Sequence, residues 1–91
     1  MSDAPFDPND CPKLARLFRM QYEEAQQAYV LLYPEGMVKL NQSAAEILKR
    51  CDGQRDAKAI TADIEQTFNM TGLEKDVISF LQLAAQQGWI A

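Results

Sequence analysis

The residue types on which most enzyme active sites depend are scarce in this chain. Among its 91 residues are two cysteines, Cys11 and Cys51, and no histidine. Histidine is the commonest general base and metal ligand, so its absence excludes nucleophile-histidine catalysis and most zinc sites. The two thiols are far apart in the sequence, and neither has a second cysteine nearby to form a metal knuckle or a redox pair. We therefore expect no catalytic site, no metal site and no bound cofactor. The chain does not read as an enzyme.

The overall charge excludes a further class of partner. The net charge is −4 and the sequence pI is about 4.6, whereas binding to nucleic-acid phosphates depends on clustered Lys and Arg. No apolar run approaches the roughly 20 residues that a membrane span needs, and the N-terminus lacks the basic and apolar regions of a signal peptide. We expect a cytoplasmic protein that contacts neither nucleic acid nor a membrane.

One group of cations stands out. It surrounds a turn between two helix-patterned segments and consists of Lys49, Arg50, Arg55 and Lys58. Cations near the last turn of a helix are favoured by the helix dipole without any partner. The same group could also dock an acidic peptide or an acidic protein surface. The sequence leaves both interpretations open.

The chain divides into an arm and one small domain. Pro5, Pro8 and Pro12 each remove a backbone donor and disfavour a helix, so residues 1–15 are predicted to form a flexible arm. Residues 16–91 are predicted to form a single domain, because a chain of this length has room for only one core.

Three strands are predicted in the first half of that domain, near residues 16–23, 29–33 and 37–40. Phe18, Met20 and Tyr22 alternate with polar residues, which is the period of a strand with one wet face. The continuous apolar run 29–33 is typical of a central strand. Pro34 and Gly36 then favour a tight turn into a short third strand. We expect an antiparallel meander with this third strand at an edge.

Three helices are predicted after the strands, near residues 43–51, 56–68 and 73–87. Ser43 with Glu46, and Thr71 with Glu74, have the spacing of capping boxes, and Asp56 can cap the middle helix. Gly53 lies where a left-handed C-terminal cap of the first helix would fall. Cys51 is expected to pack in the core as a reduced thiol, whereas the role of Cys11 is left open.

Helical periodicity assigns the faces of the third helix. At about 100° per residue, one arc gathers the expected core residues Leu73, Val77, Phe80, Leu81 and Ala84. Ile78 and Ala85 fall on one side of this arc and Leu83 on the other. An apolar side strip is either the rim of the core or one wall of a groove. Beside an edge strand, such a groove would offer an extended peptide both backbone pairing and side-chain pockets.

Strings spread along the chain resemble the PqqD family, and the resemblance covers the sequence from Lys13 to the C-terminus. These strings are Val30-Leu31-Leu32-Tyr33-Pro34-Glu35-Gly36, Lys39-Leu40-Asn41, Ser43-Ala44, Ile47-Leu48, Cys51-Asp52-Gly53, Asp76-Val77, Phe80-Leu81 and Gly88-Trp89. The resemblance implies an α+β, winged-helix-like fold, in which a three-stranded antiparallel sheet is followed by three helices.

The resemblance also implies a function. Members of the family act in biosynthesis of pyrroloquinoline quinone (PQQ), where they bind the precursor peptide PqqA and present it to PqqE. PqqE is the radical S-adenosylmethionine enzyme that crosslinks a Glu and a Tyr of this peptide. The family is the prototype of the recognition elements of ribosomally made, modified peptides, in which the peptide adds a strand beside the third strand and the third helix. Carried onto this sequence, the peptide site is Met37, Val38, Lys39, Leu40 and Asn41 facing one side of the third helix, and the resemblance does not specify which side. We expect the apolar side chains of the peptide to pack against Ile78, Leu81 and Ala85.

Two other classes of function remain open. A winged-helix DNA-binding protein would share the layout, although the third helix carries only Glu74, Lys75 and Asp76 as charged residues. A self-associating structural module is the second alternative, because an exposed edge strand invites pairing with another copy. A homodimer could form in this way through the edge strand or the N-terminal arm.

Overall fold

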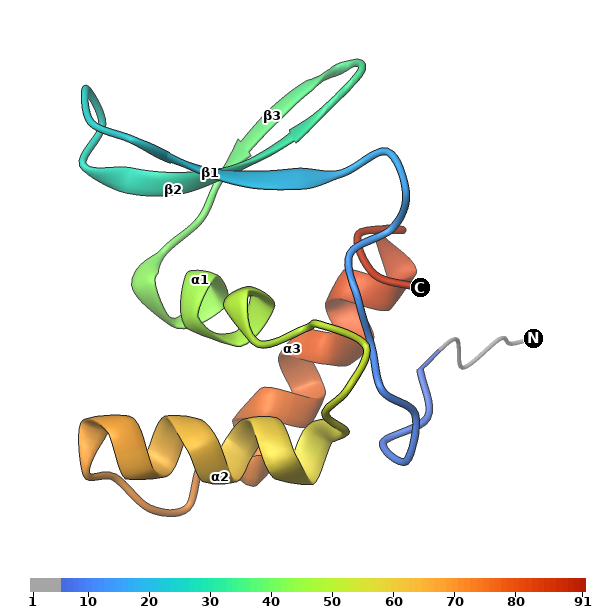
Figure 1. Cartoon of the computed structure of the whole chain (residues 1–91), viewed down its shortest axis with the longest axis vertical. Coiled ribbons are helices and arrows are strands. Elements are labelled where there is room, and N and C mark those ends of the chain that lie inside the picture. Colours follow the sequence, from blue (N-terminus) through green and yellow to red (C-terminus); the bar gives the residue numbers. More distant parts are fainter. Residues whose placement is uncertain (1–5) are drawn as a thin grey trace.

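The computed structural model describes residues 6–91 and has the predicted element order. Three strands, β1 (Arg19–Glu23), β2 (Ala28–Tyr33) and β3 (Gly36–Lys39), precede three helices, α1 (Gln42–Lys49), α2 (Ala57–Phe68) and α3 (Glu74–Gln86). Figure 1 shows the sheet at one end of the molecule and α2 at the other, with α1 and α3 between them. The α+β prediction is therefore confirmed.

The sheet is an antiparallel meander in the order β1-β2-β3, so β3 is an edge strand as expected. Its inner face carries Met20, Leu31 and Val38, which lie opposite one another across the three strands and pack into the core beside the helices. Leu31 and its neighbour Val30 are both fully buried although their side chains point to opposite faces. The continuous apolar run thus does mark the central strand.

Two of the predicted helix starts differ from the structure. Asp56 caps α2 as expected, accepting a hydrogen bond from the Ala59 amide. At α1, however, the cap is Asn41 rather than Ser43, because the Asn41 side chain accepts from the Ala44 amide and the helix begins earlier. At α3 the Thr71–Glu74 capping box does not form. The Leu73 amide instead donates to the Glu65 carboxylate of α2, so a tertiary contact replaces the local cap.

Gly53 has a left-handed backbone, with φ +80°, but it is not the C-terminal cap of α1. That cap is Arg50. The Gly53 amide donates instead to the Pro12 carbonyl, 3.0 Å away. The positive φ thus serves to dock the N-terminal segment onto the turn between α1 and α2.

The core forms where the inner face of the sheet meets the three helices. Ile60, Ile64, Val77, Leu81 and Ala84 are buried in it, as is Cys51. The prediction that Phe80 is buried is wrong. Phe80 lies at the rim, half-buried, with its ring centroid 6.3 Å from that of Trp89. The core arc of α3 is therefore narrower than its apolar residues suggested.

The described part of the expected arm, residues 6–15, packs against the domain. The Phe6 side chain is only 7% exposed and belongs to the core cluster. The Pro8 carbonyl accepts from the Ala57 amide at the start of α2, and the Ala15 amide donates to the Trp89 carbonyl. This differs from the flexible arm expected from the sequence, because prolines that exclude a helix still allow an extended segment to lie on a surface. The remaining arm residues, 1–5, lie outside the described residues.

Candidate functional site

The free edge of β3 is the first part of the candidate site. The Leu40 amide donates to the Tyr29 carbonyl of β2 at 3.0 Å. In an antiparallel ladder, residues alternately direct both backbone groups toward the partner strand or away from it. Since Leu40 faces β2, so does Val38, which lies opposite Leu31, whereas Met37 and Lys39 direct their N–H and C=O groups outward. These two residues supply the unpaired backbone groups of this edge.

The side chains of the same segment alternate between the two faces of the sheet. Val38 and Leu40 turn inward, and Leu40 is buried. Met37, Lys39 and Asn41 are exposed. Among the five predicted site residues 37–41, the buried Leu40 side chain thus cannot touch a ligand. The half-buried Val38 side chain can contact a ligand only through its exposed atoms.

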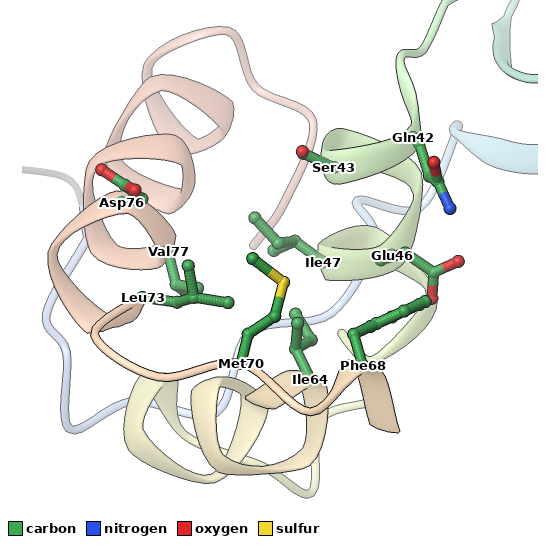
Figure 2. Close-up of a pocket in the computed structure, with 10 residues that line it drawn as sticks. All are labelled: Gln42, Ser43, Glu46, Ile47, Ile64, Phe68, Met70, Leu73, Asp76 and Val77. Atoms are coloured by element: carbon green, nitrogen blue, oxygen red, sulfur yellow. The ribbon is translucent and has the colours of Figure 1, made fainter. Parts of the chain in front are cut away.

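An apolar pocket of about 270 Å³ opens near the end of β3, between α1, α2 and α3. Figure 2 shows that the Met70 side chain, from the α2–α3 connection, reaches in between Ile47 of α1 and Val77 of α3. The apolar walls of the pocket are Ile47, Ile64, Phe68, Met70, Leu73 and Val77, and the polar residues around it are Gln42, Ser43, Glu46 and Asp76. Among residues 6–91, no Lys or Arg lines the pocket.

The structure separates the α3 residues that were predicted together. Leu81 is completely buried, so its side chain packs in the core and cannot contact a bound peptide. Asp76 lines the pocket, and Leu83, which follows it by two helical turns, lies on the same side of α3. Ile78 and Ala85 are on the opposite side, where both are half-buried against the core. An Asp at either position would therefore disturb the fold.

Three of the four predicted docking cations have partners within the chain. Arg50 hydrogen-bonds both the Glu46 and the Asp63 carboxylates and so joins α1 to α2. Lys49 pairs with Glu46 and lies 4.6 Å from the centre of the Tyr29 ring. Arg55 pairs with Asp52 at 3.3 Å. Of the four, only Lys58 has no ion pair among residues 6–91. The Lys49 and Arg55 side chains are partly exposed, so docking of an acidic partner here stays a prediction.

This network predicts how acid affects stability. The hydrogen bond from Arg50 is the largest cause that holds the pKa values of Glu46 and Asp63 below their ordinary values of 4.5 and 3.8. A carboxylate with a lowered pKa in the folded state stabilises the protein above its unfolded pKa, and this contribution is lost as the pH falls through the folded pKa. We expect the denaturant concentration at the unfolding midpoint to decrease as the pH is lowered below about 4.5. This decrease should be less steep in Arg50→Met than in the control Lys58→Met. Equal slopes for the two variants would contradict a role for Arg50.

The cysteines do not form a reactive site. Burial raises the pKa of Cys51 to about 12, with a smaller contribution from the nearby Asp52 charge. Its thiol donates to the Ile47 carbonyl of α1 at 3.4 Å. Cys11 is exposed, and both thiols are free. Because the thiolate is the nucleophilic form, Cys51 is inert at neutral pH.

Neither a metal-binding cluster nor a helix able to cross a membrane is found in the described part of the chain. Residues 6–91 contain no cluster of three or more His, Cys, Asp or Glu side chains that could hold a metal ion. None of the helices in this range combines the length and the apolar character that crossing a bilayer requires.

The pocket residues of α2 and of the α2–α3 connection were missed from the sequence. Phe68 is the last residue of α2, and Phe68 and Met70 are 39% and 50% exposed. The available signal was a pair of large apolar residues flanking Asn69, whose left-handed φ of 55° ends the helix. Exposed apolar residues gathered beside a pocket commonly mark a binding surface.

Comparisons with known proteins agree with this architecture. Residues 28–90 match the family model described as coenzyme PQQ synthesis protein D (PqqD). A PqqA binding protein of Azotobacter vinelandii is 53% identical over 83 residues, covering 90% of each chain. A PqqA binding protein of Pseudomonas aeruginosa is 54% identical over 80 residues, covering 87% of each.

A solved structure has the same fold. It is the solution NMR structure of the PqqD truncation of Methylobacterium extorquens PqqCD, described as a functional and stand-alone recognition element for ribosomally synthesized and post-translationally modified peptides. It superposes with a TM-score of 0.80 at 29% identity, covering 97% of this chain and 96% of the other. The chain described above belongs to the PqqD family.

Proposed function

We propose that this protein binds the precursor peptide PqqA by adding it as a fourth strand to the free edge of β3. The observation that carries the proposal is the pair of outward-facing backbone positions, Met37 and Lys39, on an edge strand that ends beside an apolar pocket. The names of the PqqA binding proteins at about 50% identity support the choice of peptide.

The binding energy would come from two sources. Backbone hydrogen bonds to the β3 edge are independent of the peptide sequence, whereas apolar side chains packed on neighbouring surface supply selectivity. Together they must offset the conformational entropy that a disordered peptide loses on binding. Because the pocket lies on the Leu83 side of α3, we place the path of the peptide on this side and not over Ile78 and Ala85.

The bound peptide would then be presented to PqqE, as the family resemblance implies. Holding the peptide in one extended shape fixes the position of its reactive residues and raises their effective concentration at the enzyme. The radical chemistry belongs to PqqE and its iron–sulfur cluster. This protein needs no catalytic residue for that role, and the proposal assigns it none.

The edge of β3 can be tested with one backbone donor removed. Lys39→Pro deletes an N–H that points away from the sheet, and an edge strand tolerates a proline at such a position. We expect Lys39→Pro to keep a native-like circular dichroism spectrum and to bind synthetic PqqA at least about tenfold more weakly, roughly 1.4 kcal/mol, by calorimetric titration. The control Lys39→Ala loses the same charge but keeps the N–H, and it should bind nearly as the unmodified protein does.

Other results would redirect the proposal. Equal affinity of the Pro and Ala variants would show that the β3 edge is not the binding strand. Peptide-induced amide shifts centred on Met20 and Tyr22 would assign the peptide to the other edge of the sheet, on β1. Val38→Pro is unsuitable for this test, because the Val38 N–H faces β2 and its loss would break the native ladder.

Self-association is a second candidate use of the same edge. A free strand edge pairs with any chain that offers a complementary edge, including a second copy. A dimer formed in this way would compete with the peptide, so added PqqA should shift sedimentation from dimer to monomer. A dimer that persists in saturating peptide would have a different interface.

A further inference from the structure

The pocket between α1, α2 and α3 is large enough to hold a group from another molecule. A cavity of about 150 Å³ is enough to hold a benzene molecule, and this one has a volume of about 270 Å³. Its walls include Ile47 and Val77, which are buried, and Phe68 and Met70, which are not. By volume, the pocket therefore has room for one bulky aromatic side chain or for two smaller aliphatic ones.

The carboxylates beside the pocket add a second requirement on its occupant. Glu46 and Asp76 flank the apolar walls from opposite sides (Figure 2), and no cation of the described residues lines the pocket. Glu46 is already paired with Arg50 and Lys49. Asp76 has no ion pair among residues 6–91, and it is exposed. An occupant with a basic residue next to its apolar side chain would complement Asp76, whereas an acidic neighbour would be repelled.

The position of the pocket relates it to one end of the proposed peptide strand. β3 ends at Lys39, and Gln42 and Ser43 in the first turn of α1 already line the pocket. Every pairing in the sheet is antiparallel, and antiparallel pairing is slightly more stable per residue than parallel pairing. A peptide that continues this pattern on β3 brings its N-terminal end toward α1. The pocket therefore lies beyond the peptide residue that pairs with Lys39, on the N-terminal side of the paired segment.

We propose that the pocket between α1, α2 and α3 holds a bulky apolar side chain of the bound peptide, located N-terminal to its β3-paired segment and next to a basic residue. This proposal rests on the proposed function, and it adds the feature of the peptide that is recognised. The β3 edge supplies contacts that any extended peptide can make. The pocket selects among peptides, because only one with an apolar residue at the correct distance from the pairing segment can use both sites.

The experiment uses the full chain with methyl-labelled isoleucine and valine, and synthetic PqqA as the probe. We expect added PqqA to shift the amides of Met37 and Lys39 and the methyl groups of Ile47, Ile64 and Val77 together. Intermolecular Overhauser contacts from these methyl groups should identify the inserted peptide residue. Changing that peptide residue to Ala should then weaken binding at least about tenfold, roughly 1.4 kcal/mol.

Three protein variants test the same point from the other side. The double variant Phe68→Ala with Met70→Ala removes the exposed walls of the pocket. Ser43→Phe fills the pocket from the first turn of α1. Each should weaken PqqA binding about tenfold, which corresponds to roughly 1.4 kcal/mol. Asp76→Lys should weaken it less, by about two- to fivefold, because an exposed charge is screened by water and salt. The control Leu17→Ala also removes an exposed apolar side chain, but away from the pocket, and should leave affinity unchanged.

The failures are distinguishable. If the β3 amides shift while the pocket methyl groups do not, and the double variant binds normally, the pocket inference is wrong and the proposed function stands. If PqqA binds neither region, the proposed function is wrong and the inference falls with it. If the pocket methyl groups shift without the β3 amides, the peptide does not pair with β3, and the placement argued above is overturned.

Discussion

Leu81→Ala is expected to destabilise the protein by about 3 kcal/mol, because deleting a fully buried Leu side chain leaves a cavity as well as losing its transfer energy. Leu81 is 0% exposed and lies at the centre of the α3 face that packs into the core. A domain of this size has a total stability of roughly 5 to 10 kcal/mol. The melting temperature should fall by about 12 to 24 °C, at the 4 to 8 °C per kcal/mol that is typical of small domains. Differential scanning calorimetry measures this shift directly.

Leu83→Ala is the matched control for this prediction. It makes the same substitution two positions along the same helix, where the side chain is 45% exposed. The expected loss is below about 1 kcal/mol, because much of this side chain already contacts water in the folded state. If Leu83→Ala proved the more destabilising of the two, α3 would be rotated about its axis relative to the structure described here. The assignment of Asp76 and Leu83 to the pocket side would then be lost as well.

Phe6→Ala is expected to cost about 3 kcal/mol, near the low end for removing a buried Phe, because a segment close to the chain end can partly relax around the cavity. Phe6 is 7% exposed and packs within the same cluster as the residues of α2 and α3. Its loss would also loosen the contact between the Pro8 carbonyl and the start of α2. Urea unfolding followed by circular dichroism would give the change in free energy.

The control for Phe6 is Leu17→Ala, which removes an apolar side chain that is 61% exposed and lies outside the core cluster. This variant should unfold within about 0.5 kcal/mol of the unmodified protein. A neutral Phe6→Ala would mean that residues 6–15 are as mobile as their prolines first suggested. In that event the core described above would be smaller than the burial of Phe6 implies.

Much of the fold could be predicted because its determinants are local. The alternation from Phe18 to Tyr22, the turn at Pro34 and the cap at Asp56 each act within a few residues, and all correspond to features of the structure. The caps that were predicted wrongly failed for a physical reason. Ser43 competed with Asn41 two positions earlier, and the Leu73 amide was satisfied by Glu65 from another helix. A capping motif offers an acceptor, but the tertiary structure decides which acceptor is used.

The candidate site was only partly predictable. The sequence indicated the edge strand and its residues, but not which backbone groups face outward. That depends on the register between Val38 and Leu31 and on the hydrogen bond from Leu40 to Tyr29. The sequence also divided α3 into two sides, and we expected the peptide on the Ile78 and Ala85 side, whereas the pocket lies on the side of Asp76 and Leu83.

By itself, therefore, the sequence determined the α+β fold class and the order of the strands and helices. It has no histidine, and its apolar periods change from strand-like to helix-like after Leu40; both are properties of the chain that no packing can alter. The tertiary structure alone decided the rest. Phe6 enters the core, Arg50 is neutralised by Glu46 and Asp63, and α1, α2 and α3 leave a pocket between them. Each of these features depends on contacts between residues far apart in the sequence. Local sequence patterns do not predict such contacts, because folding alone brings these residues together.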